Sequence, residues 1–226
     1  MRVAVIIPAR NEADALGQVL AEIPKDLVSE VVVVDNGSTD ATAAVASAWG
    51  AKVVAEPIPG YGRACWTGIQ ALEPTSDVVA FLDGDHSDYP EELAWLLSPI
   101  QEGRADLVIG SRSAQAAAGS MTPQQRFGTW LACRLIRQLY GVRFTDLGPF
   151  RVIRREVLEQ LQMEDRAFGW TVEMQAKAAR DGVRVVEVPV RYRRRIGRSK
   201  ISGTVKGTVR AGKDIVWTIC KVAYAS

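Results

Sequence analysis

The 226-residue chain contains few of the side chains from which zinc sites and disulfide frameworks are built. Its single histidine, His86, excludes any site that needs two imidazoles. The three cysteines lie far apart and form no CxxC pair, which argues against a disulfide framework and a cysteine-rich zinc site; they are Cys65, Cys133 and Cys220. A reducing compartment fits this cysteine usage, so we expect a cytoplasmic protein.

Long apolar runs are also missing. No run approaches the ~18 apolar residues of a transmembrane helix, so the sequence predicts none. The first apolar run follows Arg2 directly and is interrupted by the charged group Arg10-Asn11-Glu12, which is unlike a signal peptide. Hydrophobic residues make up 47% of the chain and charged residues 24%. These values are ordinary for a globular protein and exclude collagen-like, coiled-coil and wholly disordered chains.

Acidic residues are missing from one segment, residues 191–213. This segment carries nine arginines and lysines, and because the whole chain has a net charge of +2, the remainder has a net charge of −7. A basic segment on an acidic body predicts a polyanionic partner, namely a nucleic acid, a phosphate compound or a membrane surface.

Short apolar runs alternate with amphipathic stretches in the first half of the chain. This alternation predicts an α/β fold with a mostly parallel central sheet flanked by helices. The expected strands are 3–7, 31–34, 52–55, 78–82 and 107–109, and the expected helices are 13–23, a helix ending near residue 49, 63–72 and 90–100.

The second half is less regular. We expect a polar loop at 113–123 that is long enough for a mobile flap, helices at 127–139 and 170–180, a strand within 144–153 and a strand at 185–190. From residue 204 the apolar residues return at helical spacing. These patterns predict one domain over residues 1–203, followed by a basic amphipathic helix over residues 204–226.

Two carboxylates, Asp83 and Asp85, follow the strand expected at 78–82. Residues two apart at the end of a strand can face the same way, and such a pair can bind a hard divalent cation. A polar turn rich in Asp and Gly is the equal alternative. Asp88 adds a third acid or caps the next helix, and His86 is as much a candidate ligand as an ordinary polar residue.

Other polar clusters also follow strands, where open α/β sheets bind ligands. Asp35 could accept hydrogen bonds from a base or ribose, and the helix opened by Gly60-Tyr61-Gly62-Arg63 could present amides to an anion. No Walker A sequence and no Rossmann fingerprint occurs, which counts against a P-loop NTPase and a dehydrogenase. The basic segment 192–200 has three interpretations: a solvent-exposed charged segment, a nucleic-acid site with few aromatic residues among the cations, or a binding site for phosphate or diphosphate.

Taken together, six motifs in order resemble family-2 glycosyltransferases of the GT-A fold, and more narrowly the dolichol- or polyprenol-phosphate sugar synthases. The resemblance extends from Val5 to about Gly203 and is specific for the family, although not for the substrate. The motifs are Ile7–Glu12, Val34–Asp40, Asp83-Gly84-Asp85, Gly110–Arg112, Thr145–Arg151 and Val188–Lys200.

The resemblance implies a role for each matching position. The residues expected to frame the nucleotide are Pro8, Arg10, Glu12, Asp35, Asp40 and Asp83. The expected ligands of Mg²⁺ or Mn²⁺ are Asp85, Asp83 and His86; the family often has a glutamine within the stretch His86-Ser87-Asp88. The residues expected around the donor diphosphate or the acceptor phosphate are Arg112, Arg195, Ser199 and Lys200. Asp146 is expected near the acceptor, and Asp146, Asp85 and Arg195 are the expected catalytic residues.

The resemblance implies inverting transfer of a hexose from a nucleotide-diphosphate sugar, with UDP-glucose favoured over GDP-mannose. A polyprenyl phosphate acceptor needs little base catalysis, because the second pKa of a phosphate monoester is about 6. A hydroxyl acceptor would need a general base, for which Asp146 or Asp88 is the candidate. A non-catalytic module that binds nucleotide sugars or nucleic acid is the third alternative. The arginines after Tyr192 favour the phosphate acceptor, and we expect no nucleic-acid partner.

Many bacterial relatives of this kind carry two C-terminal transmembrane helices. Here the expected final helix holds Lys206, Arg210, Lys213 and Lys221 beside an apolar stripe. We therefore expect the basic C-terminal segment to place the protein at the cytoplasmic face of a membrane. A helix packed on the body is the equal alternative, and a membrane-protein partner that supplies the missing helices stays open.

Overall fold

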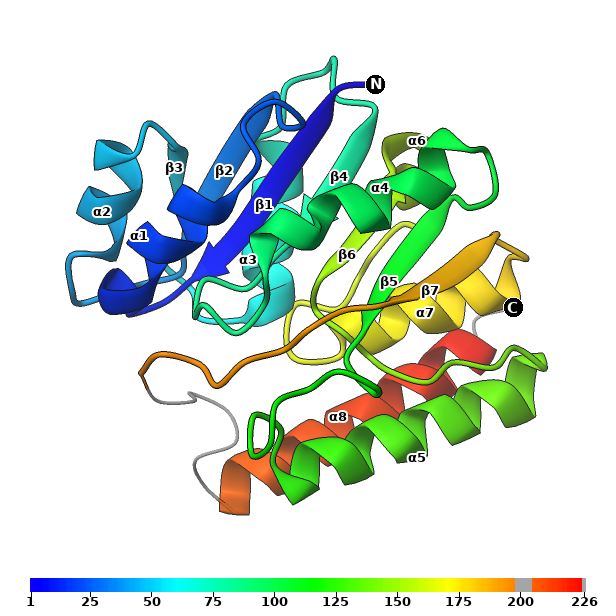
Figure 1. The fold of residues 1–226 in the computed structure, drawn as a ribbon. Coiled ribbons are helices and arrows are strands. Elements are labelled where there is room, and N and C mark those ends of the chain that lie inside the picture. The colour runs from blue at the N-terminus through cyan, green and yellow to red at the C-terminus, as the bar shows by residue number, and fades with distance from the viewer. Residues whose placement is uncertain (198–204, 225–226) are drawn as a thin grey trace.

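The computed structural model describes residues 1–197 and 205–224 and forms a seven-stranded sheet of order β3-β2-β1-β4-β6-β5-β7 (Figure 1). All neighbouring strands are parallel except β6, which runs antiparallel to both β4 and β5. The expected α/β fold with a mostly parallel sheet is thus confirmed. The strands are β1 (Val3–Ala9), β2 (Glu30–Asp35), β3 (Lys52–Ala55), β4 (Val78–Phe81), β5 (Leu107–Ser111), β6 (Arg151–Arg154) and β7 (Val185–Pro189).

Helices cover both faces of the sheet. Successive residues of β1 alternate between the faces, so that Val5 and Ile7 pack with α1, α2 and α4, whereas Ala4 and Ile6 pack with the helices of the other face. The first set is α1 (Ala13–Glu22), α2 (Thr42–Ala48) and α4 (Leu93–Gln101). The second set is α3 (Tyr61–Gln70), α5 (Pro123–Tyr140), α6 (Arg155–Gln160), α7 (Trp170–Arg180) and α8 (Val205–Tyr224).

Three local details differ from the expectations. Helix α5 begins four residues early, at Pro123, because Thr122 and Gln125 form a reciprocal capping box. The helix expected at 90–100 is a 3₁₀ turn, Pro90–Glu92, followed by α4. Helix α6 was not expected; its six residues follow β6 directly and bury Val157 and Leu158.

Helix α8 packs against α5 and α7, and Ile219 and Val222 are buried there. Thr218 donates a hydrogen bond of 3.2 Å to Asp165, and the Lys221 ammonium lies 2.6 Å from the Glu164 carboxylate. The expected division after residue 203 lies outside the described residues and stays a prediction. Among the helices described, none combines the length and apolar character needed to cross a membrane.

Candidate functional site

The carboxyl ends of β1, β2, β4 and β5 meet at one edge of the sheet, where open α/β sheets bind ligands. On the β1–β2 side, Pro8 pairs with Val34 and Ala9 pairs with Asp35. Asp35 accepts a hydrogen bond of 3.0 Å from the Ser38 amide. The structure therefore places Pro8 and Asp35 at the ends of neighbouring strands, and the nucleotide contacts expected of them stay predictions.

Asp40 has a structural task at this edge. Its carboxylate accepts hydrogen bonds from the Ala13 amide (3.1 Å) and the Thr42 amide (3.0 Å), and thereby holds the starts of α1 and α2. These bonds hold the pKa of Asp40 below its usual range, although burial acts in the other direction. Arg10 is exposed, while Glu12 is buried and faces the guanidinium of Arg195 at 3.6 Å. The nucleotide contacts expected of these residues stay predictions.

Three carboxylates, Asp83, Asp85 and Asp88, crowd into the turn after β4, which we call the acid turn. Burial and the neighbouring Asp85 raise the pKa of Asp83 to about 7, although Arg195, Arg112 and a hydrogen bond from Tyr61 oppose the rise. Burial and the neighbouring carboxylates of Asp83 and Asp85 raise the pKa of Asp88 well above its usual range.

The three carboxylates differ in their partners. Asp85 accepts a hydrogen bond of 2.9 Å from the Ser87 amide, and its other oxygen lies 2.5 Å from Nη2 of Arg195. Both carboxylate oxygens of Asp88 are buried without a hydrogen-bond partner in the described part of the chain. An unpaired buried carboxylate is costly unless a cation or a polar ligand reaches it. The acid turn is therefore incomplete as it stands.

These residues fit a divalent cation that shares its coordination with a diphosphate, because Mg²⁺ is typically held by one or two protein carboxylates plus phosphate oxygens. Over the described ranges, no group of three His, Cys, Asp or Glu side chains is arranged as a complete metal site. The expected ligand His86 points elsewhere, since its Nε2 lies 2.9 Å from Glu22. Asp83 and Asp85 as ligands thus stay a prediction, and the contact of His86 with Glu22 gives no support to His86 as a third ligand.

The basic segment that begins after β7 lies across the acid turn. The amides of Arg193 and Ile196 donate to the carbonyls of Ser87 (2.8 Å) and Asp85 (2.9 Å). The guanidinium of Arg193 also donates to the carbonyls of His86 and Asp88. Hence Arg195 reaches Asp85 from a backbone that is itself tied to the turn. The expected ligands Ser199 and Lys200 lie outside the described residues.

A buried ion pair, Arg112–Asp146, joins the end of β5 to the loop before β6. Nε and Nη2 of Arg112 donate to the two carboxylate oxygens of Asp146 at 2.7 and 2.8 Å. The amides of Arg112 and Leu147 donate to the same carboxylate, each at 2.7 Å. Burial acts to raise the pKa of Asp146, but Arg112 lowers it below its usual range. A carboxylate with four donors and a low pKa is poorly suited to accept a proton, so the geometry favours positioning of Arg112 over general base catalysis.

The start of α3 does not present free amides to an anion. The amides of Gly62 and Arg63 donate to the carbonyls of Ala167 (2.9 Å) and Arg166 (3.1 Å). A Cβ atom at Gly62 would lie 2.4 Å from the carbonyl oxygen of Asp165. The glycines of this segment thus allow two backbones to approach closely.

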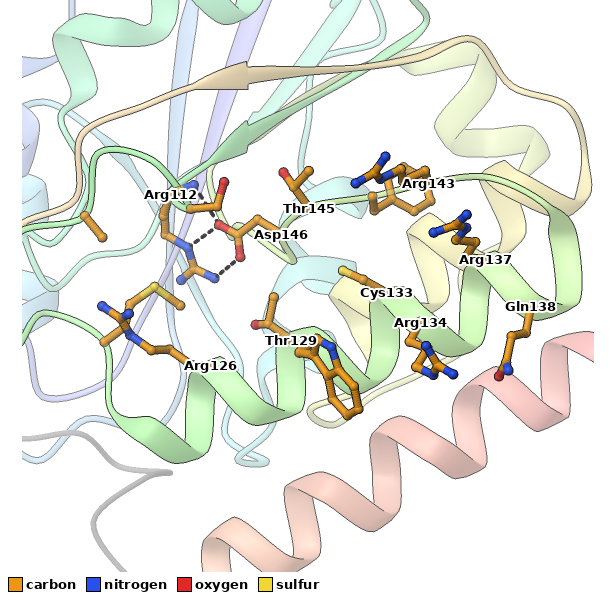
Figure 2. A pocket seen from close by; sticks show the side chains of 15 residues that line it. Arg112, Arg126, Thr129, Cys133, Arg134, Arg137, Gln138, Arg143, Thr145 and Asp146 are labelled. Carbon is orange, nitrogen blue, oxygen red and sulfur yellow. Dashed lines mark hydrogen bonds and ion pairs between the residues drawn. The ribbon is translucent and has the colours of Figure 1, made fainter.

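A groove of about 770 Å³ runs from Arg112–Asp146 along α5, and we call it the arginine groove (Figure 2). Its α5 residues recur every three or four positions, so that it follows the helix for about 18 Å at a rise of ~1.5 Å per residue. They are Arg126, Thr129, Trp130, Cys133, Arg134, Arg137 and Gln138. The opposite wall includes Met121, Arg143 and Phe144.

The charges of the arginine groove are unbalanced. In the described part of the chain, the guanidinium groups of four of its arginines form no ion pair and no hydrogen bond; they belong to Arg126, Arg134, Arg137 and Arg143. The sequence interpretation missed this site, although a signal was present. Residues 107–145 contain five arginines but no lysine and no acidic residue.

Comparison with known proteins identifies the family. A family model described as "Glycosyl transferase family 2" matches residues 4–162. An uncharacterised glycosyltransferase of Mycobacterium tuberculosis is 41% identical over 219 residues, which cover 96% of this chain and 97% of the relative. An undecaprenyl-phosphate mannosyltransferase of Micrococcus luteus is 34% identical over 222 residues, covering 92% of this chain and 90% of the relative.

Solved structures agree on the fold. Glucosyl-3-phosphoglycerate synthase from Mycobacterium tuberculosis, crystallised with Mn²⁺, UDP-glucose and phosphoglyceric acid, superposes with a TM-score of 0.79 at 25% identity. The match covers 99% of this chain and 80% of that one. With its mostly parallel sheet, its acid turn at the sheet edge and these matches, the chain belongs to glycosyltransferase family 2 and is an enzyme with the GT-A fold.

Proposed function

We propose that the protein transfers a hexose, with inversion, from a nucleotide-diphosphate sugar to a polyprenyl phosphate. The observation that carries this proposal is the arginine groove, which begins at the Arg112–Asp146 pair, next to the acid turn, and holds four arginines without an ion pair among the described residues. The names of relatives give independent support. They include the undecaprenyl-phosphate mannosyltransferase above and a dolichyl-phosphate hexose transferase of Haloferax volcanii, which is 34% identical and covers 94% of this chain.

On the donor side, Asp83 and Asp85 would hold a divalent cation, and Mg²⁺ and Mn²⁺ both suit carboxylate oxygens. When bound, such an ion offsets the negative charge that develops on the leaving diphosphate. Arg195, on the same carboxylate cluster, would add a second positive charge beside this group. Glu12 and Asp35, at the ends of β1 and β2, would face the nucleoside.

On the acceptor side, Arg112 and Arg126 would hold the phosphate, because guanidinium groups match phosphate oxygens in planar, paired hydrogen bonds. The acceptor oxygen is already ionised near neutral pH and requires no base. Asp146 would act as a positioning residue that fixes the Arg112 side chain.

A hydroxyl acceptor is the second candidate, and the unpartnered carboxylate of Asp88 favours it. A buried carboxylate with a raised pKa is a stronger base than an ordinary carboxylate. The acceptor would still be an anion, because the groove is basic. Glucosyl-3-phosphoglycerate synthase, which shares the fold, was crystallised with phosphoglyceric acid.

A lipid-partition assay separates these candidates. Purified protein is incubated with Mg²⁺ or Mn²⁺, a short polyprenyl phosphate and labelled UDP-glucose or GDP-mannose in parallel. We expect label from one donor to enter the organic phase, and we expect Asp85→Ala to abolish this transfer. If no label enters the lipid while phosphoglyceric acid becomes labelled, the hydroxyl acceptor is correct. The same assay with vesicles tests the proposed site of action at a membrane surface.

A further inference from the structure

Helix α5 and the segment that follows it expose an unusual group of side chains, which we call the α5 face: Phe127, Trp130, Arg134 and Arg137 on the helix, and Arg143 just after it. Phe127 is 62% exposed and Trp130 is 56% exposed. Their rings pack together with centroids 5.8 Å apart, and the Arg134 guanidinium lies 6.0 Å from the Trp130 ring. Large aromatic side chains and cations thus share one surface of the helix.

The arginines of the α5 face have no counter-charge. Several exposed arginines elsewhere are paired, as in Arg104–Glu102 at 2.5 Å and Arg184–Asp106 at 2.6 Å. In contrast, Arg134 and Arg137 are three residues apart on a helix without acids, and like charges at this spacing repel each other. An anionic partner outside the chain would relieve this repulsion.

The aromatic residues indicate which anion this is. Tryptophan and phenylalanine beside arginine are typical of surfaces that lie at the boundary between lipid headgroups and acyl chains. A soluble phosphate compound would use the arginines but would leave Phe127, which is outside the groove lining, in water. Charge and apolar surface together therefore favour an anionic bilayer.

We propose that the α5 face docks on the surface of an anionic bilayer, with Phe127 and Trp130 inserted among the headgroups and the arginines bound to lipid phosphates. The arginine groove runs from this face to Arg112 (Figure 2). Docking would thus place the open side of the groove where a lipid phosphate can enter it. This inference goes beyond the proposed function and does not depend on it, because vesicle binding requires no turnover.

Flotation with vesicles tests the proposal. We expect the full chain to float with vesicles of phosphatidylcholine and phosphatidylglycerol, to remain unbound with phosphatidylcholine alone, and to lose binding as salt is added. The double variant Arg134→Gln/Arg137→Gln is expected to bind at least tenfold more weakly. The matched control Arg104→Gln/Arg184→Gln removes the same charge from other exposed positions and is expected to bind as the unaltered chain does.

A second pair of variants tests the contribution of the aromatic side chains. Trp130→Ala is expected to reduce vesicle binding about tenfold, whereas Trp95→Ala, which removes an equally exposed tryptophan from α4 on the other face of the sheet, is expected to leave it unchanged. Circular dichroism and thermal unfolding establish that each variant is folded.

The proposal is overturned if the unaltered chain does not float with the vesicles, or if the control variants lose binding equally. Binding that depends on the arginines but not on Trp130 also overturns it, because the face would then hold a soluble polyanion or nucleic acid. Transfer to a water-soluble short-chain acceptor is measured separately, so that its failure would count against the proposed function alone.

Discussion

The acid turn and the arginine groove carry opposite charges on the two sides of the Arg112–Asp146 pair. In the acid turn, three carboxylates crowd together, Arg195 neutralises one of them, and Asp88 has no partner among the described residues. In the arginine groove, four guanidinium groups have no acidic or hydrogen-bonding partner in the part of the chain described. Both regions therefore hold charge that the chain itself does not balance.

The Asp146 carboxylate, between them, is satisfied by four internal hydrogen bonds, two of which come from the Arg112 side chain. The difference indicates which groups face ligands and which groups hold the site together. The acid turn suits a cation with its diphosphate, the groove suits an anionic acceptor, and the buried pair fixes the distance between them.

The largest effect is expected from the acid turn. Asp85→Ala removes a carboxylate that we expect to hold the metal and is predicted to lower kcat by about 10²–10³-fold, the size of effect seen when one group that stabilises transition-state charge is lost. Single-turnover transfer of labelled sugar measures this loss. Asp14→Ala, which removes an exposed carboxylate from α1, serves as the control. Near-normal turnover of Asp85→Ala would show that the acid turn is only a polar turn.

Loss of the Arg112–Asp146 ion pair is expected to lower stability as well as activity. Asp146→Asn leaves Arg112 buried without its counter-charge and is predicted to lower the free energy of unfolding by about 3–5 kcal/mol. Denaturant unfolding measures this change. Activity should fall as Arg112 moves, while the pH profile of the remaining activity keeps its shape. If the profile instead loses its acidic limb, Asp146 is the general base and the positioning role is wrong.

The sequence predicted the acid turn and the parallel half of the sheet because both depend on neighbouring residues. Val78–Phe81 is a short apolar run, and the acids follow it directly. In contrast, β6 pairs with β4 and β5 across the sheet, and its antiparallel direction is set by contacts distant in sequence.

The arginine groove was missed for a related reason. Its arginines are spread over residues 112–143 and meet only because α5 is helical and lies beside the segment that follows it. Likewise, no local pattern shows that Arg112, 34 residues before Asp146, fills both oxygens of that carboxylate. The absence of acids from residues 107–145 was nevertheless readable in the sequence.

The pH dependence of metal binding provides the next test of the acid turn. Because the pKa of Asp83 is raised to about 7, this carboxyl is protonated below pH 7 and must lose its proton when a cation binds. Mn²⁺ affinity, measured by calorimetry, is therefore predicted to be constant above pH 8 and to fall about tenfold per pH unit below 7. An affinity that is flat down to pH 5 would contradict the raised pKa.

On the groove side, Arg126→Gln is predicted to raise KM for a short polyprenyl phosphate about tenfold, because one charge-assisted hydrogen bond to phosphate is lost. KM for the donor should stay unchanged. Arg104→Gln, which removes an exposed arginine outside the groove, is the control with the same water-soluble acceptor and should leave both values unchanged. A rise in the donor KM would assign Arg126 to the diphosphate and remove the division between the two regions.

The smallest effect is expected where the two charge systems meet, at Arg195. Its Nη2 lies 2.5 Å from the Asp85 carboxylate, so that a cation binding to Asp85 must compete with this guanidinium. Arg195→Gln is therefore predicted to bind Mn²⁺ a few-fold more tightly in the absence of nucleotide, as measured by calorimetry. Arg194→Gln, which removes a neighbouring guanidinium that bonds the Ala118 carbonyl instead, is the matched control. Weaker binding in Arg195→Gln would mean that Arg195 orients Asp85 for the metal, because removal of a competitor can only strengthen binding.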